Sequence, residues 1–200
     1  QCCLVGSEMC IRDSGDAGHA CGHHLFGVAS TQAAIALRYW LEETNTPGTI
    51  RLYGTPAEEG GSGKVYIARD GYFDDVDIVL HWHPDDNNRV FFSSSNGNKS
   101  AKFKFKGISS HAAGAPQNGR SALDGVEAMN MMVNMLREHM DEEARIHYVI
   151  TKGGLAPNVV PEEAEVYYYV RHPNVEGVRK LFNRVVKAAE GAAKGTETKM

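Results

Sequence analysis

The sequence has few of the features that mark disulfide-rich, nucleic-acid-binding or membrane proteins. Its 4 cysteines all lie between Cys2 and Cys21. That distribution is poor for cross-linking a fold of this length, so we expect a reducing compartment, the cytoplasm. Acidic residues outnumber basic ones, 25 to 21, and the net charge is −4, which argues against a nucleic-acid partner or an anionic membrane surface. No apolar run approaches the length of a membrane-spanning helix.

The composition is otherwise ordinary for a globular protein. Hydrophobic residues make up 42% of the chain and charged residues 23%, enough apolar material to build a core. Residues 1–14 lack the charged start, apolar centre and small-residue exit of a signal peptide. They resemble translated read-through of a sequencing adapter, so we treat 1–14 as a non-native segment and leave it out of the fold prediction.

One short stretch is rich in metal-binding side chains. Residues 18–24 contain His19, Cys21, His23 and His24, and imidazole and thiolate are ligands of borderline-soft divalent metals. A buried cysteine or a hydrogen-bonded histidine is the ordinary alternative. Because the spacing of a zinc finger is absent, further ligands have to come from elsewhere. Glu58 and Glu59, and His81 and His83, are the other candidates.

The first half of the chain alternates between helical and extended patterns. Residues 25–43 and 64–70 have helical spacing, 49–54 and 76–81 are β-branched or apolar runs typical of strands, and 56–63 is a glycine-rich loop. Such alternation predicts parallel strands whose carboxyl ends share one edge of a sheet. The three polar motifs each lie at such an end, so we expect them to converge.

The second half predicts a different architecture, with a boundary at Asn96-Gly97-Asn98. The expected elements are a strand at 100–106, a helix at 121–139, strands at 146–151 and 164–171, and a helix at 175–193. This is the order of the ferredoxin-like split-βαβ fold. We place the domains at 15–97 and 98–200.

Five motifs occur in an order that resembles a known family. They are Gly-His-Ala-Cys-Gly-His at 18–23, Pro-Ala-Glu-Glu-Gly at 56–60, a strand-end histidine, Ser-His-Ala-Ala-Gly-Ala-Pro at 110–116 with Gly-Arg-Ser-Ala-Leu-Asp at 119–124, and Asn-Val-Val-Pro-Glu at 158–162. The sequence is similar to the aminoacylase and carboxypeptidase-G metallopeptidases, in their amidohydrolase branch. The resemblance implies a partial α/β catalytic domain with a mostly parallel sheet at 15–97, and an α+β lid and dimerisation domain at 98–200.

The resemblance also implies a site with two divalent metal ions, zinc or manganese. Cys21, His23, Glu59 and one strand-end histidine would be ligands, and Glu58 the general base. A carboxylate in that position can take a proton from a metal-activated water and deliver it to the leaving amine. Counting from Val76-Asp77 favours His83 as the strand-end ligand, with His81 as the alternative.

In the second domain the resemblance assigns three more residues. His111 would reach across a homodimer and polarise the scissile carbonyl, while Asn158 and Arg171 would contact substrate. His24 is either a residue that orients a ligand or a surface histidine. His19 is not a ligand in the family pattern, and we expect three further histidines, His139, His147 and His172, at the surface.

The implied activity is metal-dependent hydrolysis of the amide bond of a small N-acyl or N-aroyl amino acid, of the aminobenzoyl-glutamate kind. Members of the family are much longer, and one of their ligand histidines would follow Met200. We therefore expect this chain to be a fragment that is inactive alone. The alternatives are a metal-storage or zinc-sensing module and a non-catalytic dimerisation module. Glu58 separates them, because a purely metal-binding site needs no general base.

Overall fold

The computed structural model describes residues 22–84, 86–90 and 94–200, without the side chains at 59 and 60. The predictions for residues 1–14, His19 and Cys21 therefore lie outside the described residues. The chain divides into two compact units at Val90 and Phe91, and each is described by itself.

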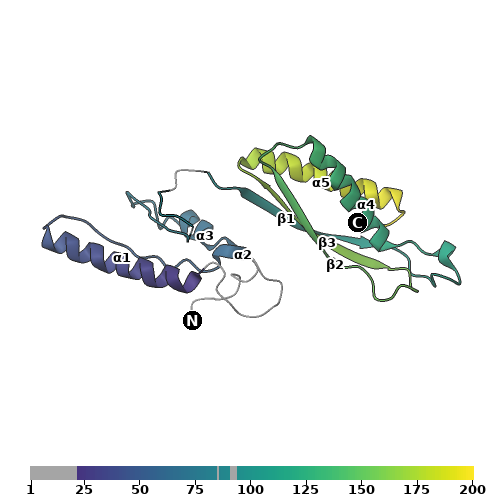
Figure 1. Cartoon of the computed structure of the whole chain (residues 1–200), viewed down its shortest axis with the longest axis horizontal. Helices are drawn as coiled ribbons and strands as arrows, with labels where there is room; N and C mark the ends of the chain where they lie inside the picture. The colour runs from purple at the N-terminus through teal and green to yellow at the C-terminus, as the bar shows by residue number, and fades with distance from the viewer. Residues whose placement is uncertain (1–21, 85, 91–93) are drawn as a thin grey trace. The chain divides into compact units, whose positions relative to one another are not determined.

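The second unit is an antiparallel sheet with two helices on one of its faces (Figure 1). Its elements are β1 (Gly97–Lys106), η2 (Pro116–Asn118), α4 (Ala122–Leu136), η3 (Arg137–His139), β2 (Arg145–Lys152), β3 (Glu163–His172) and α5 (Val175–Gly195). The strand order is β1-β3-β2, with both neighbours antiparallel to β3. This confirms the split-βαβ order predicted for this half. The main chains of Lys106 and Lys199 exchange two hydrogen bonds, of 2.7 and 2.8 Å, beside β1.

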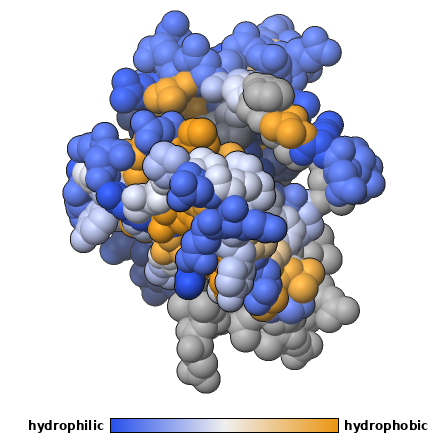
Figure 2. Space-filling model, turned by 90° about the vertical axis from the view of Figure 1, so that its left-hand side faces the viewer, coloured by the Kyte–Doolittle hydropathy of each residue, from blue (hydrophilic) through white to orange (hydrophobic). Residues whose placement is uncertain are grey.

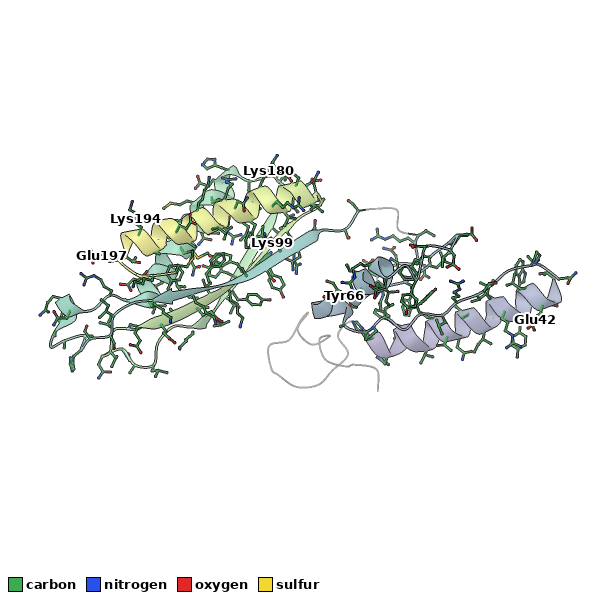
Figure 3. All side chains as sticks on the ribbon, turned by 180° about the vertical axis from the view of Figure 1, so that it is seen from behind. Glu42, Tyr66, Lys99, Lys180, Lys194 and Glu197 are labelled. Atoms are coloured by element: carbon green, nitrogen blue, oxygen red, sulfur yellow. The ribbon has the colours of Figure 1, made fainter. Side chains whose placement is uncertain are left out.

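The core lies between the sheet and the two helices. Alternate residues of β3 point inward and are buried: Ala164, Val166, Tyr168 and Val170. On α5 the buried residues recur at helical spacing, and Figure 3 shows Lys180 and Lys194 on the side of that helix away from the sheet. The period of two in the strand and of about 3.6 in the helix leaves each element one apolar face.

Both helices begin at side-chain caps. The Ser121 hydroxyl accepts a hydrogen bond from the Asp124 main-chain N–H (3.1 Å), and the Asn174 side chain accepts one from the Glu176 N–H (2.7 Å). Each cap satisfies a donor that the first helical turn leaves unpaired. No helix in the described part of the chain is long and apolar enough to cross a bilayer.

Two polar side chains are buried with their partners. The Tyr168 hydroxyl donates to Asn130 Oδ1 (2.5 Å), and burial raises the pKa of that tyrosine. His172, expected at the surface, is only 9% exposed. Its Nδ1 accepts from the Asn174 N–H (2.9 Å), so Nε2 carries the proton and donates to Asp141 (3.1 Å). The surface prediction for His172 was wrong because the residue occupies the inward position of β3.

The described part of the first unit contains three helices: α1 (His23–Glu43), α2 (Glu58–Gly61) and α3 (Gly63–Arg69). The helices predicted at 25–43 and 64–70 are present, and the expected loop at 56–63 contains the single turn of α2. The two expected strands, 49–54 and 76–81, are extended but join no ladder among the described residues. The reason is physical: an extended segment becomes a strand only when a neighbouring strand accepts its main-chain hydrogen bonds.

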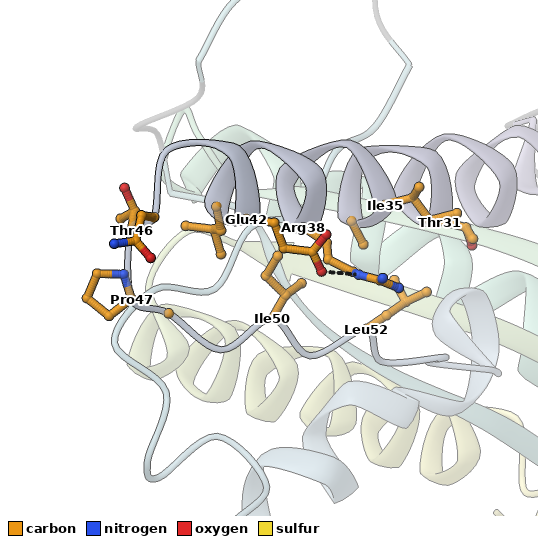
Figure 4. A pocket seen from close by; sticks show the side chains of 12 residues that line it. Thr31, Ile35, Arg38, Glu42, Thr46, Pro47, Ile50 and Leu52 are labelled. Atoms are coloured by element: carbon orange, nitrogen blue, oxygen red, sulfur yellow. Dashed lines mark hydrogen bonds and ion pairs between the residues drawn. The ribbon is translucent and has the colours of Figure 1, made fainter.

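The described part of the first unit has almost no core. None of α1 is buried, and large apolar side chains such as Val28 (64% exposed) and Leu80 (85%) face solvent. An open groove of about 640 Å³ runs between α1 and residues 46–52 (Figure 4). Hydrophobic side chains also stand among hydrophilic ones on the surface in Figure 2. Exposed apolar surface of this extent marks a face that packs against more protein.

Candidate active site

The first motif forms the beginning of α1. Gly22 precedes the helix with φ +70°, and its carbonyl accepts a hydrogen bond from the Leu25 N–H (2.8 Å). Glycine adopts this left-handed conformation without the steric cost that other residues meet. The turn makes His23 the first residue of α1, directly after Cys21 and Gly22 in the sequence.

The second motif forms a tight turn around Glu58. Ala57 (φ 57°) and Ser62 (φ 52°) flank α2 in the left-handed region, which is strained for residues with a side chain. A Cβ at Gly63 would lie 2.0 Å from the Pro56 carbonyl oxygen, so this position requires glycine. The turn places Glu58 Oε2 3.9 Å from His23 Nε2. Strained backbone conformations of this kind are typical of functional sites, where they hold a side chain in one orientation.

The third motif, which contains Trp82 and His83, contacts the beginning of α1 through an aromatic cluster. The ring of Phe26, one turn into α1, lies 4.8 Å from that of His23, 5.0 Å from Trp82 and 5.5 Å from His83, centroid to centroid. A Cβ at Gly22 would be 3.9 Å from Pro84. The described residues therefore place Glu58 near His23, and His83 against the Phe26 ring that also contacts His23.

A hydrogen bond to the main chain selects one tautomer of the His83 ring. Nδ1 lies 2.9 Å from the Pro84 carbonyl oxygen. Since that oxygen can only accept, Nδ1 carries the proton and Nε2 of the neutral ring has a lone pair available for a metal. His81 is exposed and has no hydrogen bond or ring contact within the described residues. The contrast favours His83 over His81 as the ligand.

The donor set suits a divalent metal, although only part of it is described. Imidazole nitrogen and carboxylate oxygen are ligand types for zinc and manganese. Within residues 22–84, 86–90 and 94–200, no three His, Cys, Asp or Glu side chains are grouped closely enough to hold an ion. Two of the four predicted ligands, Cys21 and the Glu59 side chain, lie outside the described residues, and the ligand roles of all four stay predictions.

In the second unit, local hydrogen bonds select one tautomer of His111. Its Nδ1 accepts from the main-chain N–H groups of Ala113 (3.2 Å) and Gly114 (2.9 Å). The neutral ring therefore carries its proton on Nε2, and the side chain is exposed. An exposed N–H held in one orientation is the group that a carbonyl-polarising role requires.

Asn158 lies beside His111. Its main-chain carbonyl accepts from the Ala112 N–H (3.0 Å), and His111 forms a β-bridge with Val159. Both residues therefore lie at the end of the sheet where β1 stops and β3 begins.

Arg171 lies at the opposite end of β3. From Glu163 to Arg171 the strand covers roughly 27 Å at about 3.4 Å per residue. Within one copy of this unit, Arg171 cannot contact the same small substrate as His111 and Asn158.

The register also reveals a residue that the sequence prediction missed. Arg145 is the Cα partner of Arg171 across β2 and β3. Both residues occupy outward positions of their strands, but the pairing could not be known without the register of the sheet.

The comparisons identify the class of protein. The profile of the peptidase dimerisation domain of the M20 peptidases matches residues 93–197, and the chain belongs to this family. This confirms the family resemblance that the ordered motifs indicate.

The chain is similar to two curated hydrolases. It is 51% identical over 185 residues to one of the subunits of the p-aminobenzoyl-glutamate hydrolase of Escherichia coli K12, a match that covers 92% of this chain and 38% of that protein. It is 34% identical over 181 residues to the Xaa-Arg dipeptidase of Mus musculus, covering 90% of this chain and 42% of that protein. The chain thus spans less than half the length of these relatives.

Among solved structures, the fold resembles a hydantoinase/carbamoylase family amidase from Burkholderia ambifaria. The TM-score is 0.50 at 11% identity, over 53% of this chain and 27% of that one.

Proposed function

We propose that this chain is part of a longer metal-dependent amidohydrolase that cleaves the amide bond of N-acyl or N-aroyl amino acids of the aminobenzoyl-glutamate kind. The observation that carries the proposal is that Glu58 lies 3.9 Å from His23 and that His23 and His83, from separate motifs, both contact Phe26. The similarity to a p-aminobenzoyl-glutamate hydrolase supports the substrate class. The fragment alone would be inactive.

The residues divide into ligands and groups that move protons. Cys21, His23, Glu59 and His83 would hold two divalent ions, zinc or manganese, whose chemistry is to lower the pKa of a bound water. Glu58 takes the proton of the attacking water and delivers it to the leaving nitrogen, which would otherwise depart as an unstable amide anion. The Nε2–H of His111 donates to the carbonyl oxygen as negative charge develops there.

The geometry of the second unit argues for two copies per active site. His111 and Asn158 lie at one end of the sheet and Arg171 at the other, so a single lid cannot supply all three to one substrate. We propose a homodimer in which one protomer contributes His111 and Asn158, and the protomer that holds the metal contributes Arg171. The guanidinium of Arg171 would then grip the substrate carboxylate.

The β2 edge of the sheet is the surface best suited to this dimer. Tyr148 and Ile150 on β2 are 37% and 41% exposed, and Met131 and Met135 on α4, which line the same groove, are 62% and 60% exposed. A cavity of about 550 Å³ lies between the two elements. The other edge of the sheet, at residues 100–106, is less suited, because β1 carries lysines at alternate positions, and side chains of one sign oppose pairing with a second copy.

A charge placed on this surface is expected to split the dimer. Met131→Glu should raise the dimer dissociation constant by roughly two to four decades, because burying an unpaired charge in an interface costs about 3–5 kcal/mol. Sedimentation velocity on the full-length protein measures the change. Val175→Glu, at an equally exposed position (62%) on α5, is the matched control and should leave the dimer intact. If both variants remain dimeric, the interface lies elsewhere.

The proposed activity is tested on the full-length protein with p-aminobenzoyl-glutamate. We expect bound zinc or manganese by elemental analysis, release of glutamate on incubation, loss of that release after chelation, and its return when the metal is restored. The isolated 200-residue chain should release none. Tightly bound metal with no hydrolysis of any N-acyl amino acid would instead support the storage or sensing module.

A further inference from the structure

The outward face of the sheet has two electrostatically different ends. At the Glu163 end, opposite charges face each other across the strands: Glu165 lies 3.2 Å from Lys102 and 3.6 Å from Lys104, and Lys152 pairs with Glu163. The Thr151 hydroxyl and the Lys102 ammonium lower the pKa of Glu165. Cross-strand pairs of opposite sign are the arrangement that stabilises a sheet.

At the Arg171 end of the sheet, like charges rather than opposite charges face each other across the strands. Arg171 on β3 faces Arg145 on β2, and two positions further along Tyr169 faces His147. Within the described residues, no carboxylate pairs with either guanidinium. Like charges placed directly opposite each other destabilise a sheet. The pair costs stability in the free protein, and an anion bound between the two guanidiniums would offset that cost.

Both guanidiniums are held in place. Arg145 Nη1 donates to the main-chain carbonyls of Glu142 (2.6 Å) and Ala144 (2.7 Å), which leaves its remaining N–H groups for another acceptor. The Arg171 guanidinium carbon lies 5.5 Å from the centre of the Tyr169 ring. Asn98 flanks Arg171 on β1 and adds an amide donor to the same row. Side chains held in this way lose little further entropy when they bind a ligand.

We propose that Arg145 and Arg171 form a subsite for two carboxylates, which makes the enzyme selective for amides of acidic amino acids. The inference rests on the proposed function, in which Arg171 grips the main-chain carboxylate. Arg145 then binds the side-chain carboxylate of a glutamyl or aspartyl group. His147 and Tyr169 border the subsite on the neighbouring row.

The spacing suits such a dianion. Directly opposed residues on antiparallel strands have Cβ atoms about 5 Å apart, and the two carboxyl groups of glutamate are separated by only a few bonds. Each guanidinium can grip its carboxylate with a pair of parallel hydrogen bonds. A substrate with a neutral side chain offers Arg145 no carboxylate, so this substrate gains no binding energy from Arg145.

The test compares p-aminobenzoyl-glutamate with p-aminobenzoyl-alanine in the full-length enzyme. Arg145→Gln should lower kcat/KM for the glutamate compound by roughly 10- to 100-fold, the usual value of a charged hydrogen bond, and leave the alanine compound unchanged. Arg145→Lys should retain part of the preference, because it keeps the charge but loses the bidentate geometry. Lys104→Gln removes a cation from the same face, where it pairs with Glu165, and should change neither substrate.

The outcomes separate this inference from the proposed function. Hydrolysis by the unsubstituted enzyme, combined with an equal effect of Arg145→Gln on both compounds or no effect on either, overturns the subsite and leaves the proposed function standing. If neither compound is hydrolysed, the proposed function fails, and binding decides the subsite. N-acetylglutamate should then shift the NMR signals of the Tyr169 ring in the 200-residue protein more than N-acetylalanine does, and Arg145→Gln should remove that difference. The absence of the difference in the unsubstituted protein overturns the subsite.

Discussion

Replacing Glu58 with glutamine in the full-length enzyme is expected to lower kcat by roughly two to four decades, the usual contribution of a general base. Glutamine keeps the size and the hydrogen-bonding reach of the side chain but cannot take a proton from water. The metal content is expected to stay unchanged, because Glu58 is assigned no ligand role. Elemental analysis and turnover measured on the same preparation check both parts.

Glu42→Gln is the matched control for this variant. Glu42 lies on α1 in the same unit, is exposed, and pairs with Arg38 (2.9 Å) at the far end of the helix from His23. This substitution should leave kcat unchanged. Loss of metal together with activity in Glu58→Gln would reverse our assignment, making Glu58 a ligand and Glu59 the candidate base.

Mixing two inactive variants is expected to restore activity. Full-length Glu58→Gln and His111→Ala, allowed to exchange protomers, should recover roughly one quarter of the unsubstituted activity, since random exchange makes half of the dimers mixed and each mixed dimer holds one intact site. That site combines Glu58 of one protomer with the His111 that its partner donates. Turnover followed during exchange measures the recovery.

The positions along the sheet supply two internal controls. His111→Ala with Asn158→Ala should not recover activity, because both residues lie at the same end of one lid and serve the same site. His111→Ala with Arg171→Gln should recover, because these residues lie at opposite ends of β3 and serve different sites. Recovery by the first pair, or none by Glu58→Gln with His111→Ala once exchange is shown, would exclude donation in trans.

The sequence predicts the second unit almost completely. The alternation in 164–171 and the helical spacing in 175–193 fall within β3 and α5, because each of these elements completes its hydrogen bonds inside the same compact unit. His172 is the exception among the predicted positions. It continues the inward positions of β3, so the same alternation that identified the strand also predicts its burial.

Strand pairing is the property that the sequence does not specify. Segments 49–54 and 76–81 have strand composition, but no ladder forms among the described residues because they contain no neighbouring strand for these segments. Likewise, the opposition of Arg145 and Arg171 depends on the register, which a local pattern does not determine. For the site, the glycine turns and the Phe26 cluster place Glu58 near His23 and His83 against the same Phe26 ring, and the roles of these residues stay predictions.

The unequal edges of the sheet limit how this protein can assemble. On one side, β1 carries Lys102, Lys104 and Lys106, and the main chain of Lys199 already bonds to its end. A second β1 approaching this edge would meet a row of like charges. In the dimer proposed above, the β2 edge accepts the other copy, and a self-complementary contact through one edge closes after a single pairing. We therefore expect the unequal edges, which favour a two-fold dimer, to oppose open-ended growth of the sheet into fibrils as well.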